Sequence, residues 1–255
     1  MADSYTISII PEPHNQYTDE NGESQCSAFA LAGIMSVFAK KFFGRDLRFS
    51  TSYIYGMYRR ESNKYGKGMF EEEAVAGVAS GGSCLYEEYP CLDKAADAYD
   101  YVRVNPALTD SAKKYAVMFY GYEKISGKSR EEVFEKARAA LITYDLPLYA
   151  SIDGHAVILC GYDGDCYLYR DSDGIKSLKI KDYDKIKEVY RLIMAERGTK
   201  RFIDVPDNHW GKEAINYCTE KGYMNGISED LFAPDKALTR AEIAQIIYNI
   251  LKGEE

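Results

Sequence analysis

The spacing of apolar residues predicts helices in the first half of this chain and strands in the second. Apolar positions recur every three to four residues in segment 26–41, and capping signals start or end further helical segments. The predicted helices span residues 26–41, 53–60, 71–79, 92–101 and 129–143. The predicted strands span residues 7–10, 116–122, 148–152, 155–162, 167–172 and 188–194. Helices followed by antiparallel strands predict an α+β fold with a cleft between its two halves.

Short polar signals define the ends of several elements. Ser50 is placed to cap the helix that follows it, and Ser129 with Glu132 has the spacing of a capping box. Gly81-Gly82 is a helix C-cap signal. The turn sequence at residues 163–165 (Asp-Gly-Asp) predicts a hairpin between the strands at 155–162 and 167–172.

The polar segment 196–200 (Glu-Arg-Gly-Thr-Lys) is the predicted domain boundary, because it lacks periodic apolar residues. We therefore expect one domain at 1–197 and a second at 198–255. The second domain is predicted to be all-α, with helices at 210–221 and 239–251. It is small for an independent fold.

Composition restricts the class of protein. The 255 residues are 46% hydrophobic and 28% charged, which is ordinary for a globular protein, and the net charge of −8 argues against nucleic acid as a partner. No run of 18 apolar residues suggests a membrane span. The N-terminus has neither a basic flank nor an apolar signal core. We expect either a cytoplasmic protein or a mature region that has lost its leader.

Six cysteines are present: Cys26, Cys84, Cys91, Cys160, Cys166 and Cys218. None forms a C-x-x-C pair, so no structural zinc site is expected, and no cofactor is either. Cys84 and Cys91 are seven residues apart and could form a disulfide, which the sequence leaves open.

Cys26 is the candidate nucleophile, because it begins a predicted helix, where free backbone N–H groups favour a thiolate. The alternative is a buried, inert cysteine. A nucleophilic cysteine needs a base, and the chain has only His14, His155 and His209. His155 begins an apolar strand and is the best placed, although a purely structural histidine would fit there too.

Asp171 is the candidate for orienting His155. His155 lies nine residues before Gly164 and Asp171 seven after it, so the two are within one bulge of being opposite in the predicted hairpin. An oxyanion could be bound by the backbone N–H of Cys26 and by a glutamine side chain, either Gln16 or Gln25.

Three segments carry a resemblance to papain-like cysteine peptidases. Residues 25–30 (Gln-Cys-Ser-Ala-Phe-Ala), with Gln16 upstream, resemble that family's nucleophile region. Residues 154–158 (Gly-His-Ala-Val-Ile) resemble its histidine strand, and residues 169–174 (Tyr-Arg-Asp-Ser-Asp-Gly) its Arg-Asn-Ser-Trp-Gly strand. The resemblance covers residues 5–195 and implies a two-lobed papain-like fold.

The resemblance also implies roles for individual residues. Cys26 would be the nucleophile, His155 the general base and acid, Asp171 the residue that orients it, and Gln16 the side-chain oxyanion donor. Gly68, with Met69 and Gly154, would bind the substrate.

The chain departs from the family pattern at four points. Asp171 replaces an asparagine, Ser27 and Asp173 replace two tryptophans, and Gln16 lies about four residues too far from Cys26. The family's inhibitory propeptide is not recognisable in this chain, which fits a mature enzyme or one never made as a zymogen.

The C-terminal segment resembles one S-layer homology motif. The matching residues are 202–205 (Phe-Ile-Asp-Val), 209–210 (His-Trp), 222–226 (Gly-Tyr-Met-Asn-Gly), 232–234 (Phe-Ala-Pro) and 239–242 (Thr-Arg-Ala-Glu). The resemblance implies binding of bacterial cell-wall polysaccharide, with Trp210, Arg240 and Glu242 as contacts. Such motifs commonly occur in threes. The alternative is that Trp210 and Arg240 only hold two helices together.

The sequence therefore predicts a cysteine endopeptidase, secreted or at the surface of a bacterium, with a cytoplasmic location left open. Its partners would be a peptide or protein substrate and cell-wall polysaccharide, with no nucleic acid, no membrane span and no cofactor. Two alternatives remain: an enzyme that transfers the acyl group to an amine rather than to water, and a catalytically weakened wall-binding protein.

Overall fold

The structure is a computed structural model of the chain. It describes residues 3–12, 25–60, 68–90, 95–171, 174–179, 185–195, 202, 204–206, 209–228 and 231–252. The chain divides into two compact units, residues 1–194 and 195–255, which are described separately below.

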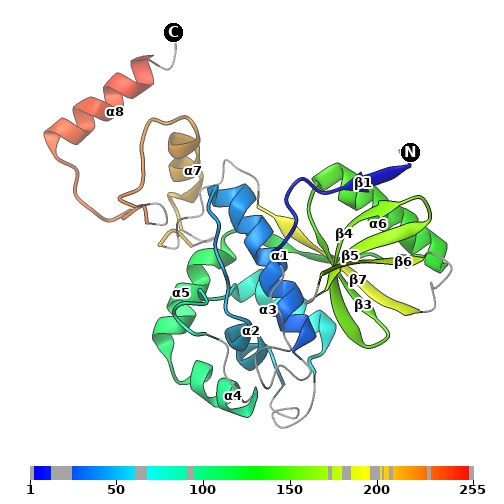
Figure 1. The fold of residues 1–255 in the computed structure, drawn as a ribbon. Helices are drawn as coiled ribbons and strands as arrows, with labels where there is room; N and C mark the ends of the chain where they lie inside the picture. The colour runs from blue at the N-terminus through cyan, green and yellow to red at the C-terminus, as the bar shows by residue number, and fades with distance from the viewer. Residues whose placement is uncertain are drawn as a thin grey trace. The chain divides into compact units, whose positions relative to one another are not determined.

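The first unit combines helices with an antiparallel sheet, which confirms the predicted α+β class (Figure 1). Its elements, in chain order, are β1 (Ser4–Thr6), α1 (Cys26–Phe43), α2 (Thr51–Met57), α3 (Glu71–Gly81), α4 (Ala95–Arg103), α5 (Pro106–Ala116), β2 (Phe119–Lys124), α6 (Arg130–Tyr144), β3 (Leu148–Ile152), β4 (His155–Asp163), β5 (Cys166–Asp171), β6 (Gly174–Lys179) and β7 (Ile186–Met194). Helices α1 to α5 gather on one side of the unit, and the sheet with α6 forms the other (Figure 1).

The strand order in the sheet is β2-β7-β3-β4-β5-β6, and β1 pairs with the far end of β4. β3 and β1 share one edge of β4: Leu148 pairs with Leu159, and Thr6 with Gly161. Gly161 is required here, because a Cβ on it would lie 2.1 Å from the carbonyl oxygen of Tyr5.

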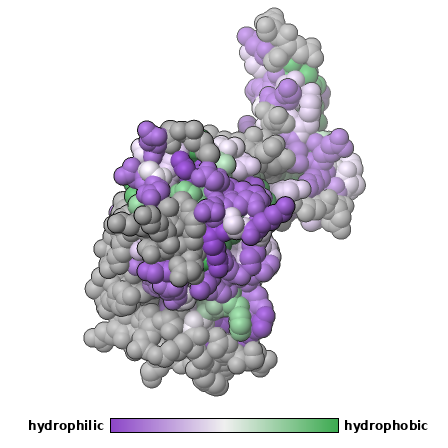
Figure 2. Space-filling model, turned by 90° about the vertical axis from the view of Figure 1, so that its right-hand side faces the viewer, coloured by the Kyte–Doolittle hydropathy of each residue, from purple (hydrophilic) through white to green (hydrophobic). Residues whose placement is uncertain are grey.

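On the face shown in Figure 2, most of the coloured surface is hydrophilic, as expected for residues outside the core.

Helix α1 is the central helix of the first unit and packs against β4 and β3. A Cβ on Gly33 would lie 2.7 Å from Cδ1 of Ile158, so the glycine allows a close approach of helix and strand. α1 is long and apolar enough to meet the usual criteria for a membrane span, but 67% of it is buried within the protein, as in a core helix.

Several capping predictions are confirmed. The Ser50 hydroxyl accepts a hydrogen bond from the N–H of Tyr53 at 3.0 Å and begins α2. Ser129 accepts from the N–H of Glu132 at 3.2 Å and begins α6, and Gly82 with a φ of 67° ends α3. Cys84 is a buried free thiol, whereas Cys91 lies outside the described residues.

Three predictions about elements were wrong or incomplete. The first strand is Ser4–Thr6 rather than 7–10, because the N-terminal segment pairs with β4 and turns away before Pro11. Helix α5 was not predicted, although Pro106 stands at its first turn, where proline is favoured. Strand β6 was also missed; it gains its hydrogen bonds from β5, a long-range pairing that local patterns do not reveal.

The second unit contains α7 (Lys212–Glu220) and α8 (Arg240–Lys252). Its small core is formed by Phe202, Val205, Ile215 and Phe232. The Asp204 carboxylate accepts hydrogen bonds from the N–H groups of Phe232 (2.9 Å) and Ala233 (2.6 Å), which ties the start of the unit to the segment before α8.

Asp145 connects the N-terminal segment, α1 and the end of α6. Its carboxylate accepts hydrogen bonds from the Tyr5 hydroxyl (2.6 Å), from the N–H (2.8 Å) and hydroxyl of Ser8, and from Nζ of Lys41 (2.5 Å). Partial burial alone would raise the pKa of Asp145, but these hydrogen bonds outweigh it and hold the pKa well below the usual range.

We expect Asp145→Asn to lower the free energy of unfolding by about 2 kcal/mol at pH 7, because four donor groups lose a charged acceptor. Since the folded-state pKa of Asp145 lies below the unfolded value of about 3.9, this stabilisation is complete above that pH. It is lost as pH falls further, so variant and wild type should converge in acid.

Urea denaturation at pH 7 and pH 3 measures this difference. The matched control is Asp46→Asn, because Asp46 also pairs with a lysine, Lys40 at 2.6 Å, but its side chain is 85% exposed. The control should change stability far less at either pH. Equal losses in the two variants at pH 7 would contradict the role assigned to Asp145.

Candidate active site

Cys26 is the first residue of α1, as the sequence predicts, and its thiol is half-buried. Burial by itself would raise the pKa of the Cys26 thiol. Hydrogen bonds with the His155 side chain and with the N–H groups of Ala156 and Ser27, together with the charge on His155, lower the pKa below its ordinary value. The surroundings of Cys26 therefore favour the thiolate.

His155 is the first residue of β4 and lies between Cys26 and Asp171. Its Nε2 is 2.8 Å from Oδ1 of Asp171, so the ring nitrogen that remains for the Cys26 thiol is Nδ1. The hydrogen bond with Cys26, together with the hydrogen bond and charge of Asp171, raises the pKa of His155 to about 9 although burial opposes this. At neutral pH the site therefore favours an imidazolium at His155, next to the Asp171 carboxylate and the Cys26 thiol.

A bulge at Cys160 brings Asp171 to the same face of the sheet as His155. In the β4–β5 pairing, Gly161 is opposite Leu168 but Leu159 is opposite Tyr169, so Cys160 is an extra residue. The bulge shifts the register by one, which places Asp171 opposite Val157, two residues from His155 and on the same face. Without the extra residue, Asp171 would be opposite Ile158, whose side chain points to the other face.

The predicted substrate-binding residues belong to two separate segments of the first unit. Gly154, with a φ of 77°, is in the turn just before His155. Gly68, with a φ of 74°, and Met69 precede α3. The N–H of Gly68 donates to the Tyr55 hydroxyl, and the charge of Cys26 also acts on Tyr55.

The predicted side-chain oxyanion donor, Gln16, lies outside the described residues. The other candidate, Gln25, occupies the N-cap position of α1 and is buried. Within the described part of the chain its Oε1 makes no hydrogen bond. Among the described residues, no group of three or more His, Cys, Asp and Glu side chains is arranged to bind a metal ion.

Sequence reasoning missed a contact immediately behind Cys26. The hydroxyls of Ser27 and Tyr149 are 2.9 Å apart and buried. A polar residue inside the apolar start of α1 was a signal that Ser27 has a partner. The identity of this partner was not predictable, because Tyr149 lies 122 residues away from Ser27 in the chain.

The three predicted wall-binding residues have different surroundings in the structure. Trp210 is 94% exposed and stacks on His209 with ring centroids 5.8 Å apart, so the alternative that it packs between helices is wrong. Arg240 is exposed at the start of α8. Glu242 accepts a hydrogen bond from the N–H of Thr239 at 2.7 Å, and its own N–H donates to the Thr239 hydroxyl at 3.2 Å. Glu242 therefore caps α8.

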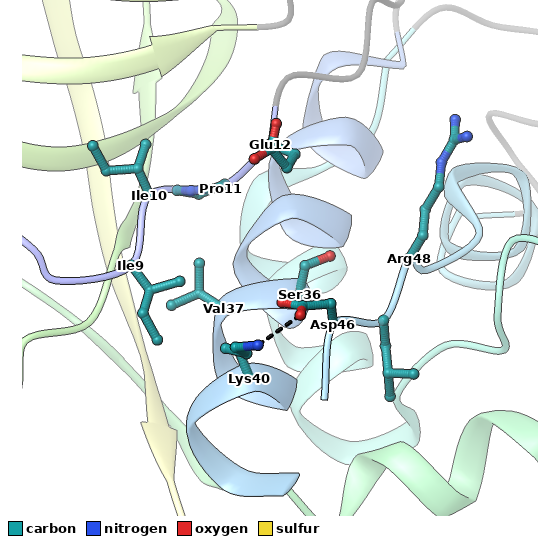
Figure 3. Close-up of a pocket in the computed structure, with 10 residues that line it drawn as sticks. Ile9, Ile10, Pro11, Glu12, Ser36, Val37, Lys40, Asp46 and Arg48 are labelled. Atoms are coloured by element: carbon teal, nitrogen blue, oxygen red, sulfur yellow. Dashed lines mark hydrogen bonds and ion pairs between the residues drawn. The ribbon is translucent and has the colours of Figure 1, made fainter. Parts of the chain in front are cut away.

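A cavity of about 300 Å³ lies beside the C-terminal half of α1, well away from Cys26 (Figure 3). It is lined by Ile9, Ile10, Pro11, Glu12, Ser36, Val37, Lys40, Asp46, Leu47 and Arg48. Ser36 is ten residues beyond Cys26, about 15 Å along the helix. This cavity is therefore separate from the Cys26–His155–Asp171 site.

Comparison with known proteins identifies a domain in the second unit. Residues 201–244 match the S-layer homology domain. The chain is 50% identical over 52 residues to the S-layer protein sap of Bacillus anthracis, covering 20% of this chain and 6% of that protein. It is 30% identical over 109 residues to a cellulosome-anchoring protein of Acetivibrio thermocellus, covering 42% of this chain and 24% of that protein. The chain thus spans at most 24% of the length of these two relatives.

The first unit is similar to solved cysteine proteases. The Carica candamarcensis cysteine protease CMS1MS2 in complex with E-64 has a TM-score of 0.56 at 16% identity, over 77% of this chain and 100% of that one. Digestive procathepsin L 3 of Tenebrio molitor has a TM-score of 0.55 at 13% identity, over 76% and 70%. The predicted papain-like fold is therefore confirmed.

We expect Cys26 to react with iodoacetamide at pH 6 to 7 faster than a free thiol, because its hydrogen bonds and the charge on His155 lower its pKa. Between about pH 6 and 8 the alkylation rate should rise less steeply than that of glutathione, which rises about tenfold per pH unit below a pKa near 8.5. Mass spectrometry of alkylated peptides measures the rates. Cys166→Ser, which removes another half-buried thiol, should leave the fast alkylation of Cys26 unchanged. A Cys26 rate that follows glutathione across this range would contradict the assignment.

Proposed function

We propose that the first unit is a cysteine endopeptidase. The observation that carries this proposal is the hydrogen-bonded series Cys26–His155–Asp171 at the junction of a helix and a sheet. The likeness to cysteine protease structures supports it at the level of the fold. A nucleophile, a base and a residue that orients the base are the parts that acyl transfer from a peptide requires.

The geometry supports a two-stage reaction. The Cys26 thiolate attacks the peptide carbonyl carbon, and backbone N–H groups at the start of α1 stabilise the oxygen that becomes negative. The His155 imidazolium gives its proton to the leaving amine as the C–N bond breaks, which leaves a thioester on Cys26. His155 then removes a proton from water, the hydroxide attacks the thioester, and the acid is released with the thiolate restored.

Asp171 acts through His155 in this reaction. Its carboxylate accepts the Nε2–H hydrogen bond, which directs Nδ1 at the thiol, and its negative charge favours the imidazolium. An asparagine at this position would keep the hydrogen bond and remove the charge. The aspartate should therefore extend the pH range in which the imidazolium is present.

We expect Cys26→Ala to abolish hydrolysis of fluorogenic peptide libraries and Cys166→Ser to retain it. Activity should fall above about pH 9, because His155 must carry a proton to release the amine. In Asp171→Asn this upper limit should move to lower pH, since the charge that raises the pKa of His155 is gone. Turnover measured against pH in the three variants is the test. Hydrolysis that persists in Cys26→Ala would refute the proposal.

We also propose that the second unit attaches the enzyme to a bacterial cell wall. The supporting observation is Trp210, an aromatic ring that is 94% exposed inside a matched S-layer homology domain. An exposed tryptophan contributes nothing to the core, and its flat face suits contact with a polysaccharide ring. The relatives in this region are named as surface-layer and anchoring proteins, which supports a location at the bacterial surface.

We expect the full chain to sediment with purified Gram-positive cell walls and Trp210→Ala to bind about tenfold more weakly, as expected when one anchor residue is truncated. The matched control is Tyr217→Ala, because Tyr217 on α7 is a second exposed aromatic residue of the same unit. Its affinity should stay close to that of the wild type. Unchanged sedimentation of Trp210→Ala would exclude Trp210 as a wall contact.

A further inference from the structure

The hydroxyls of Ser27 and Tyr149 join the first turn of α1 to strand β3. The two oxygens are 2.9 Å apart, and the residues are 5% and 0% exposed. Two buried hydroxyls at this distance satisfy one another, with one donating and the other accepting. The contact spans the boundary between the helical and the sheet halves of the first unit.

This contact links the two elements that carry the reacting side chains. Ser27 is bonded to Cys26, and Tyr149 pairs with Ile158 on β4, three residues after His155. The thiol belongs to the helix and the imidazole to the sheet, so their separation depends on how the start of α1 sits on β3 and β4. Catalytic geometry tolerates displacements of only about 0.5 Å.

The start of α1 has no side-chain cap. Its N-cap residue, Gln25, makes no side-chain capping bond, and the first turn has no acidic residue. Cys26 itself hydrogen-bonds to His155 and to the N–H of Ala156 on β4, and Ala28 and Leu31 after it are buried in the core. Helix ends fray unless they are tied down, so an anchor one residue from the nucleophile has a large effect on its position.

Tyr149 is itself held firmly. Its ring packs edge-on against that of Tyr190, with centroids 6.1 Å apart, and both rings belong to adjacent strands. Burial and the charges of Glu71, Cys26 and Glu188 raise the pKa of Tyr149, so its hydroxyl keeps its proton across the working range of pH. A rigid, neutral hydroxyl suits a fixed anchor.

We propose that Ser27 and Tyr149 are positioning residues that hold Cys26 against His155 through their hydroxyl–hydroxyl bond. The effect on turnover rests on the proposed peptidase function, whereas the effect on thiol reactivity does not. The two hydroxyls act through the helix rather than on the thiol itself; the N–H of Ser27, which hydrogen-bonds to the Cys26 thiol, is kept in every variant. The pair occupies the position directly behind the nucleophile where the papain-like pattern has an aromatic side chain instead.

The test is a double-mutant cycle of Tyr149→Phe and Ser27→Ala in the full chain. Each single variant should lower the rate of Cys26 alkylation by iodoacetamide at pH 7 by roughly tenfold, because a displaced thiol loses its imidazolium partner. Each should lower kcat by a similar factor and leave KM unchanged. The double variant should be no slower than the single ones, because the two hydroxyls act through one bond.

Stability separates positioning from simple packing. Each single variant leaves one buried hydroxyl without a partner and should unfold at lower urea concentration, whereas the double variant removes both and should recover part of the loss. The alkylation rate of the double variant should nevertheless stay low.

Two further variants serve as controls. Ser27→Thr keeps the hydroxyl and should restore at least half of the wild-type rate. Tyr58→Phe, which removes a hydroxyl bonded to the Gly82 carbonyl at 2.7 Å, should alkylate like the wild type.

The outcomes distinguish this inference from the proposed function. A wild-type Cys26 that is as reactive as expected, together with wild-type alkylation in Tyr149→Phe, would overturn the inference and leave the peptidase proposal standing. Reactivity that recovers in step with stability in the double variant would also overturn it, since packing alone would then explain the single variants. Fast alkylation that depends on the pair, without hydrolysis of any peptide, would support the positioning role and count against the peptidase.

Discussion

One extra residue in a β-strand determines whether Asp171 can face His155. Side chains alternate between the two faces of a sheet, so a carboxylate on β5 faces the His155 ring only if the register has the correct parity. The bulge at Cys160 shifts the register by the one residue that this requires. The Cys160 carbonyl accepts a hydrogen bond from the N–H of Ile7 at 2.9 Å, so the N-terminal segment stabilises the irregularity on which the His155–Asp171 contact depends.

The residues of the site could be predicted because each has a local signature. Cys26 follows a polar segment and begins an apolar helix, and His155 begins an apolar strand. Asp171 was predicted to lie within one bulge of His155 because counting from the hairpin turn is sensitive to single residues. Their roles in catalysis stay predictions, as does that of Gln16, whereas their proximity is now described.

Interactions between distant parts of the chain were harder to predict. Strand β6 and the position of β1 depend on partners in β5 and β4 that no local pattern specifies. The Ser27–Tyr149 contact joins residues that each looked ordinary in the sequence. In the second unit, Glu242 fitted both a helix cap and a ligand contact by sequence, and its hydrogen bonds with Thr239 show that it serves as the cap.

The exposure of Trp210 has a practical consequence for experiments on this protein. It is the single tryptophan in the chain, and it lies in the second unit, whereas the 23 tyrosines are distributed more widely. Intrinsic tryptophan fluorescence therefore reports on the surroundings of Trp210 and is nearly blind to unfolding of the first unit. Because the indole is already in water, its emission should be red-shifted in the native state and change little on denaturation. Circular dichroism, or tyrosine fluorescence, is the appropriate probe for the first unit.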